Sequence, residues 1–144
     1  MRVETYSDRY FLDVVKLVEK FYSEYLTDYY GAPLKEVITE TINSFKDSTF
    51  LLIDGDKCVG VLAGVEIKSK LNDQKFFQEI MWYVDKPFGR YAFYLIKQAK
   101  IMLKSTGFSN IIMSVIENEK VSKIENIYKR MKLRKLETHY LGEL

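Results

Sequence analysis

The sequence predicts an α/β (α+β) fold with a mixed, mostly antiparallel central sheet of about six strands and helices on both faces. Two observations support this prediction. The turn Asp54-Gly55-Asp56 joins two apolar segments, as in an antiparallel hairpin. Farther along, a strand, an amphipathic helix and a second strand over residues 76–116 form a β-α-β crossover, which makes one strand pair parallel. At 144 residues, the chain is expected to form one domain over residues 1–144.

The first half of the chain is predicted to begin with a strand and two helices. Ser7 is placed to cap the first helix, in which apolar residues recur at helical spacing from Phe11 to Tyr25. Residues 27–32 are expected to form a loop, and Pro33 fits the first turn of the second helix. The expected elements are a strand over Arg2–Tyr6, the two helices ending at Tyr25 and Phe45, and the hairpin strands Ser48–Ile53 and Lys57–Ile67.

The second half alternates strands and helices. Gly107 is expected at the left-handed position that ends a helix, and the apolar, β-branched segment after it reads as a buried strand. The expected elements are a strand over Phe76–Val84, a helix over Arg90–Ser105, a strand over Asn110–Ile116, a helix over Val121–Met131 and a final strand over Leu133–Leu141. The predicted order is therefore β-α-α-β-β-β-α-β-α-β.

Charge and composition exclude several classes of function. The 22 basic and 20 acidic residues give a net charge of +2, which argues against nucleic acid as a partner. The basic segment Lys129–Lys135 reads as a solvated helix end, with a phosphate-facing or RNA-binding patch as the alternative. Residues 1–20 lack a signal-peptide core, and no apolar run is long enough to span a membrane, so a cytoplasmic protein is expected.

The single cysteine and the single histidine also limit the chemistry. Cys58 cannot form an intramolecular disulfide and, within an apolar strand, is expected to be a buried, inert thiol. His139 is expected to be solvent-exposed. One histidine and one cysteine cannot complete a structural zinc site, so no metal is expected.

The segment from Phe77 to Met102 contains the main candidate site. A buried strand leads through the turn Asp85–Arg90 into a helix, and unpaired N–H groups at such a helix start favour an anion such as phosphate. Glu79 precedes this turn on the strand. Considered alone, Glu79 is either a base in an apolar setting or a strand-edge carboxylate paired with a surface lysine.

Three segments in this order resemble the GNAT superfamily of acyl-CoA-dependent N-acyltransferases, and the element order resembles it from end to end. Gln78–Val84 is similar to the family's central strand with its inward Glu. Pro87–Ile96 is placed like the family's phosphate loop. Ile127–Leu133 is similar to the Tyr-x-x-x-Gly-Phe ending before the family's last strand. The small size is similar to phage and bacterial members. The sequence departs from the family pattern at Pro87, at Arg90 and at Lys132, where the family has glycine before the last strand.

The resemblance implies acetyl-CoA as co-substrate and assigns roles to particular residues. The pantetheine arm would pair with the backbone of Trp82, Tyr83 and Val84 and contact Asn118. The phosphates would sit on the N–H groups of the residues that open the helix, with Arg90 adding charge; these residues are Phe88, Gly89, Arg90, Tyr91 and Ala92. Glu79 takes the general-base position and Tyr128 the general-acid position. From the residues alone, Tyr128 also fits a core aromatic, and Asn118 fits a loop cap.

The acceptor implied by the resemblance is a primary amine of a small molecule or a protein. Tyr25, Asp28, Tyr29 and Tyr30 offer aromatic faces and a charge to such an amine, or form the surface of a homodimer. The sequence thus predicts an acetyl-CoA-dependent N-acetyltransferase. The alternative is a GNAT-like fold that has lost catalysis and binds another protein.

Overall fold

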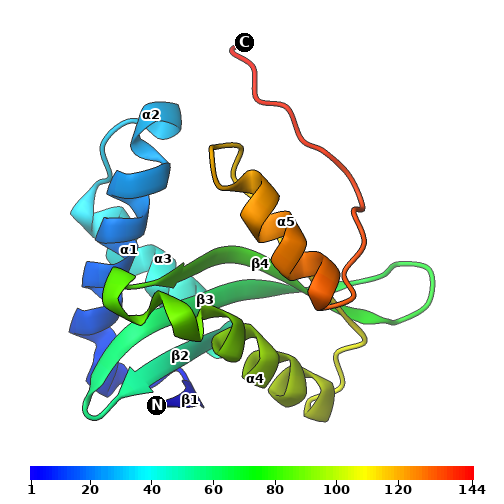
Figure 1. Cartoon of the computed structure of the whole chain (residues 1–144), viewed down its shortest axis with the longest axis horizontal. Coiled ribbons are helices and arrows are strands. Elements are labelled where there is room, and N and C mark those ends of the chain that lie inside the picture. Colours follow the sequence, from blue (N-terminus) through cyan, green and yellow to red (C-terminus); the bar gives the residue numbers. More distant parts are fainter. The chain divides into compact units, whose positions relative to one another are not determined.

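Five strands form one open sheet in the computed structural model, which describes residues 1–144. The chain forms two compact units, an N-terminal unit (Met1–Ser114) and a C-terminal unit (Val115–Leu144). The N-terminal unit contains the whole sheet, in the spatial order β1-β2-β3-β4-β5 (Figure 1). The strands are β1 (Arg2–Thr5), β2 (Thr49–Asp54), β3 (Lys57–Lys68), β4 (Lys75–Val84) and β5 (Asn110–Ile112).

The sheet is mixed and mostly antiparallel, as predicted. The pairs β1–β2, β2–β3 and β3–β4 are antiparallel, and only β4–β5 is parallel. Gly55, with φ +58°, provides the left-handed residue that the tight β2–β3 turn requires. Gly60 and Gly64 let β4 approach β3 closely, since a Cβ on Gly64 would meet the Phe77 ring and the Gln78 carbonyl.

The strand count differs from the prediction at the C-terminal end. The expected strand Leu133–Leu141 does not form, and β5 ends at Ile112 rather than at Ile116. Leu136, Tyr140 and Leu141 are 68%, 92% and 70% exposed, so this segment has no buried apolar face that would hold it in a sheet.

Two helices and their connections cover one face of the sheet. Buried residues of α1 and α3, such as Val14, Leu17 and Ile42, form one hydrophobic cluster with Leu51 of β2 and Met81 of β4. The elements on this side are a 3₁₀ helix (Asp8–Tyr10), α1 (Phe11–Tyr25), α2 (Thr27–Tyr30), α3 (Lys35–Phe45) and a second 3₁₀ helix (Lys46–Ser48).

The loop expected over residues 27–32 begins instead as the short helix α2. The N–H groups of Tyr30 and Gly31 donate to the carbonyls of Leu26 and Thr27 at 2.9 Å each, which closes one helical turn. Gly31, with φ +77°, ends the turn.

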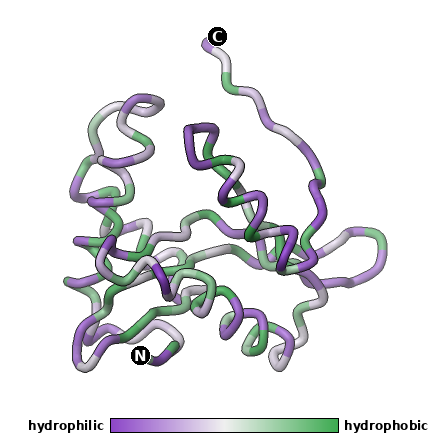
Figure 2. Tube along the Cα trace, viewed as in Figure 1, coloured by the Kyte–Doolittle hydropathy of each residue, from purple (hydrophilic) through white to green (hydrophobic).

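Helix α4 (Ala92–Ser105) covers the opposite face, so helices lie on both faces as predicted. Its buried residues Leu95, Ile96, Ala99 and Leu103 pack on the side of the sheet that contains Phe50, Leu52, Leu62 and Phe77. In Figure 2 the central strands are hydrophobic over most of their length, whereas the helices alternate between hydrophobic and hydrophilic residues. Burial of the sheet on both faces explains this difference.

Helix α4 ends with the glycine cap that the sequence predicts. Gly107 has φ +87°, its N–H donates to the Lys104 carbonyl at 3.3 Å, and the Phe108 N–H donates to the Leu103 carbonyl at 3.1 Å. This bond pair is a Schellman motif, which satisfies carbonyls that the helix end leaves unpaired.

The C-terminal unit contains one helix, α5 (Val121–Arg130), in which no residue is fully buried. Its C-terminus repeats the Schellman bonds: the Lys132 N–H donates to the Lys129 carbonyl at 3.0 Å, and the Leu133 N–H donates to the Tyr128 carbonyl at 2.9 Å. Lys132 has φ +61°. The lysine therefore occupies a left-handed position, which explains why the resembling pattern has glycine there.

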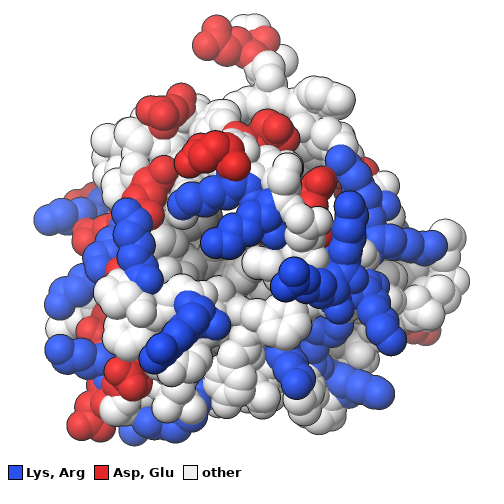
Figure 3. Space-filling view, viewed as in Figure 1, with Lys and Arg blue, Asp and Glu red and all other residues white.

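No helix in the structure combines the length and apolar character that crossing a membrane requires. Cationic and anionic side chains both occur on the face drawn in Figure 3, in keeping with the small net charge.

Candidate functional site

The candidate site begins where β4 and β5 part. Their parallel ladder pairs Phe76, Phe77 and Gln78 with residues Asn110–Ile112 and goes no farther, while β4 continues to Val84. The segment Glu79–Val84 therefore extends past the end of β5. An extended ligand that joins a sheet edge makes main-chain hydrogen bonds at such a place.

The pairing of β4 with β3 shows which backbone groups face that edge. The Asp85 N–H donates to the Val59 carbonyl at 2.9 Å, and the ladder continues through Tyr83 with Val61. Because an antiparallel ladder alternates, the main-chain groups of Tyr83 point to β3, and those of Trp82 and Val84 point to the β5 side. Of the three predicted arm-binding residues, the structure places Trp82 and Val84 on the expected edge.

A β-bulge lies at the point where the strands part. Ala63 pairs with Met81 and Gly64 with Glu79, which leaves Ile80 as an extra residue on β4. The bulge reverses the alternation of side chains, so Met81 belongs to the core cluster below α1 and α3, whereas Glu79 and Phe77 lie on the other face. The bulge thus positions Glu79 beside the start of the β4 segment that has no partner in β5.

Glu79 is buried, with 7% of its surface exposed. Its Oε2 accepts a hydrogen bond from the Ser114 N–H at 2.9 Å. Burial raises the pKa of this carboxyl to about 7, and the bond from Ser114 opposes that rise in part. Glu79 is therefore not the exposed, lysine-paired carboxylate of the alternative reading; it can exchange a proton near neutral pH.

The turn between β4 and α4 forms a 3₁₀ helix (Lys86–Tyr91). The Phe88 N–H donates to the Asp85 carbonyl at 2.8 Å, and the Ala92 N–H donates to the Gly89 carbonyl. The predicted phosphate donors Phe88 and Ala92 are thus engaged within the turn, and the 3₁₀ helix also engages N–H groups of the residues between them. A side chain on Gly89 would meet nothing within 4 Å, so the surface there is open. The exposed Arg90 guanidinium lies 4.9 Å from the centre of the Tyr91 ring.

Helix α1 holds this turn by ion pairs that the sequence analysis missed. The Lys20 ammonium contacts both Asp85 carboxylate oxygens at 2.9 Å, and Asp85 Oδ1 also accepts from the Lys86 N–H at 3.2 Å. Glu24 accepts from the Tyr83 hydroxyl at 3.1 Å and lies 3.4 Å from the Lys86 ammonium. Burial and Glu24 raise the pKa of Tyr83 well above its usual value. No local pattern signals pairs so distant along the chain.

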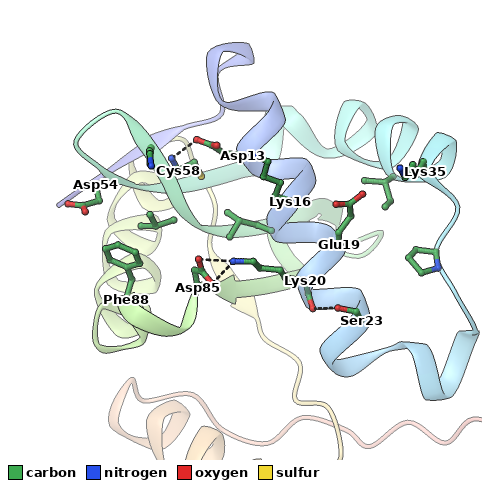
Figure 4. Close-up of a pocket in the computed structure, with 15 residues that line it drawn as sticks. Asp13, Lys16, Glu19, Lys20, Ser23, Lys35, Asp54, Cys58, Asp85 and Phe88 are labelled. Carbon is green, nitrogen blue, oxygen red and sulfur yellow. Dashed lines mark hydrogen bonds and ion pairs between the residues drawn. The ribbon is translucent and has the colours of Figure 1, made fainter.

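A groove of about 820 Å³ adjoins the same ion pairs (Figure 4). Charged side chains of both signs line it, and Lys20 reaches toward Asp85 there, while Asp13 accepts from the Cys58 N–H at 3.0 Å. Burial raises the pKa of the Cys58 thiol to about 12, so the thiolate is scarce at neutral pH. The prediction that Cys58 is buried is confirmed.

The remaining predicted residues lie in the C-terminal unit or in the α1–α3 connection. Tyr128 is half-buried on α5, and Asn118 Oδ1 accepts from the Lys120 N–H at 2.8 Å, so Asn118 orders the turn before α5. The catalytic role of Tyr128 and the cofactor role of Asn118 stay predictions. Tyr29 and Tyr30 are 50% and 62% exposed on α2, and the exposed His139 lies 3.1 Å from Glu137.

Comparison with known proteins identifies the fold. No family model and no curated protein matches the sequence. Among solved structures, an aminoglycoside acetyltransferase from an uncultured soil metagenomic sample matches 99% of this chain and 97% of its own, with TM-score 0.75 and 17% identity. The ribosomal-protein-alanine N-acetyltransferase of Brucella melitensis biovar Abortus 2308 matches 99% and 98%, with TM-score 0.77 and 11% identity.

A third similar structure is the aminoglycoside 6'-N-acetyltransferase AAC(6')-IG of Acinetobacter haemolyticus, with TM-score 0.72, 12% identity and coverage of 100% and 98%. These structures are acetyltransferases, and this chain shares their fold. The predicted fold class is thereby confirmed.

Proposed function

We propose that this chain is an N-acetyltransferase that transfers an acetyl group from acetyl-CoA to a primary amine by direct attack in a ternary complex. The observation that carries the proposal is the early end of the β4–β5 ladder, with the buried Glu79 carboxyl at the point where the strands part. That arrangement combines an edge for an extended ligand with a proton acceptor beside it.

The residues of the N-terminal unit fit acetyl-CoA at two places. Trp82 and Val84 direct main-chain groups to the β5 side of β4, beyond the end of the β4–β5 ladder, where they would pair with the pantetheine arm. The Arg90 side chain would hold the phosphates beyond the end of β4. Main-chain N–H groups of residues 88–92 would join it after the 3₁₀ helix opens. When bound, acetyl-CoA supplies the acetyl group as a reactive thioester.

Glu79 would act as the base. An alkylammonium has a pKa near ~10 and must lose its proton before its nitrogen can attack a carbonyl carbon. With a pKa of about 7, Glu79 is ionised over much of the neutral range yet basic enough to take that proton, directly or through water. In the whole reaction a nitrogen–carbon bond forms and a carbon–sulfur bond breaks. The ammonium proton passes to Glu79, and the second proton that the nitrogen loses after the attack ends on the departing sulfur, which leaves as the thiol.

The acceptor would approach from the α1–α3 connection. Exposed Tyr29 and Tyr30 offer aromatic faces to a cationic amine, and Asp28 offers a carboxylate. Two of the similar structures are named for aminoglycosides and one for a ribosomal protein, and either a small-molecule or a protein amine fits these groups.

One observation favours a second function, a catalytically inactive GNAT fold that binds another protein. The N–H groups of Phe88 and Ala92 are used inside the 3₁₀ helix, and Pro87 supplies no N–H at all. A turn that keeps these bonds would hold phosphate weakly.

Calorimetric titration with acetyl-CoA separates the two functions. We expect saturable binding by the wild type and by Glu79→Gln, with turnover lost only in Glu79→Gln. Glu66→Gln, which alters an exposed β3 carboxylate 3.4 Å from Lys75, is the matched control and should retain both binding and turnover. Absence of binding at millimolar acetyl-CoA would refute the enzyme and leave the binding module.

A further inference from the structure

A small apolar cavity lies beside the β4 bulge, within the N-terminal unit. Its volume is about 50 Å³, and side chains of α1, α3, β2, β3 and β4 line it. Those that matter most here are Val14, Thr41, Phe45, Ala63, Ile80 and Met81. The lining is almost entirely carbon, and the hydroxyl of Thr49, which lines the cavity, already donates to the Phe45 carbonyl at 2.7 Å.

Ile80 connects the cavity to the candidate site, because it lines the cavity and follows Glu79 in the chain. Most of its lining side chains are buried, and Thr41 and Ile80 are the exposed ones, so the opening lies between them. Ile80 is the extra residue of the bulge and follows Glu79 directly. The opening therefore lies beside the β4 bulge, on the face of the sheet that packs against α1 and α3, one residue along the strand from the proposed base.

The direction of the proposed arm brings the donor to this opening. The phosphate-binding turn follows Val84, so an arm paired along β4 runs from Val84 past Trp82 toward Ile80. Its thioester end would lie beside Ile80, because Glu79 must reach the amine that attacks the thioester. The acyl carbons beyond the thioester carbonyl then meet the cavity.

We propose that this cavity receives the acyl chain of the donor and makes propionyl- and butyryl-CoA donors of this chain besides acetyl-CoA. The proposal rests on the proposed function and extends it to a class of short, straight acyl groups. The bonds that form and break are those of acetyl transfer, since the added methylenes take no part in them.

The size and the lining of the cavity both support this donor class. A water-sized group needs roughly 10–15 Å³, so about 50 Å³ accepts roughly three to five such groups, enough for a butyryl tail. Each methylene that leaves water for a carbon-lined site tightens binding by about fourfold. A charged acyl group such as succinyl would find no partner on this lining.

The test is calorimetric titration of the protein with CoA and with acetyl-, propionyl- and butyryl-CoA. The wild type should bind the acyl-CoAs in rising order of affinity, about fourfold per methylene. Ala63→Val adds bulk to the cavity floor and should bring butyryl-CoA down to the affinity of acetyl-CoA. Ala32→Val, the same change at an exposed position, is the control and should retain the wild-type order.

A second variant guards against misfolding. Thr41→Leu places a larger side chain at the exposed rim and should weaken butyryl-CoA more than acetyl-CoA. If all acyl-CoAs bind the wild type equally, or if neither variant changes their order, the cavity proposal is wrong while the enzyme proposal stands. If neither CoA nor any acyl-CoA binds, both proposals fall.

Discussion

The buried Glu79 carboxyl should make the stability of this protein fall as the pH rises, and replacing it by glutamine should remove that effect. In the folded chain burial raises the pKa of Glu79 from 4.5 to about 7. Between these values the folded state holds a proton that the unfolded state has released. The free energy of unfolding therefore decreases with pH in this window.

The structure gives the size of this effect. At about 1.4 kcal/mol for each pH unit, the displacement of the Glu79 pKa costs the folded state about 3 kcal/mol above pH 7 and nothing below pH 4.5. In the Glu79→Gln variant the side-chain amide is neutral at every pH, and its oxygen can still accept from the Ser114 N–H. Relative to the wild type, this variant should thus gain about 3 kcal/mol between pH 4.5 and pH 7.

Urea unfolding at a series of pH values measures this gain. At each pH, the wild-type free energy of unfolding is subtracted from that of Glu79→Gln. This difference cancels the contributions that the titration of all other groups makes to stability. The same subtraction for Glu66→Gln, at an exposed ion pair, should show no gain with pH. A Glu79→Gln difference that stays flat from pH 4.5 to pH 7 would show that the carboxyl ionises at its ordinary pKa, and the argument for a tuned base would fail.

Three further predictions concern the backbone and the ion pairs. Lys132→Gly should raise stability by about 0.5–1 kcal/mol in thermal unfolding, because φ +61° strains a lysine and suits a glycine, whereas Lys132→Ala should give no gain. Gly64→Ala should cost about 1–3 kcal/mol because its Cβ meets the next strand, while Gly89→Ala, with open space around it, should cost under about 1 kcal/mol; equal costs would contradict the strand contact. Lys20→Met should lower the free energy of unfolding by no more than about 1 kcal/mol, since its pair with Asp85 is half-exposed; a larger loss in urea would mean that the pair has a structural role that its exposure does not explain.

Local patterns were sufficient for most of the fold. The β2–β3 hairpin follows from a glycine turn between apolar segments, and α4 follows from its apolar spacing and the Gly107 cap. Each signal lies within a few residues, so no knowledge of the tertiary structure is needed to read it. The prediction of the final strand was wrong. Isolated apolar residues such as Leu136 and Leu141 do not show whether a partner surface exists to bury them.

The candidate site, like the fold, could be predicted from the sequence only in part. The sequence indicated Glu79 and the turn before α4, because a strand that leads into a helix and contains a carboxylate is a local pattern. It did not indicate the bulge at Ile80, the early end of β5, or the pairing of Lys20 with Asp85. These features come from contacts between segments far apart in the chain. Only the folded structure determines which strand edge lacks a pairing partner and how far a carboxylate is desolvated. Both depend on neighbouring residues that the sequence does not specify.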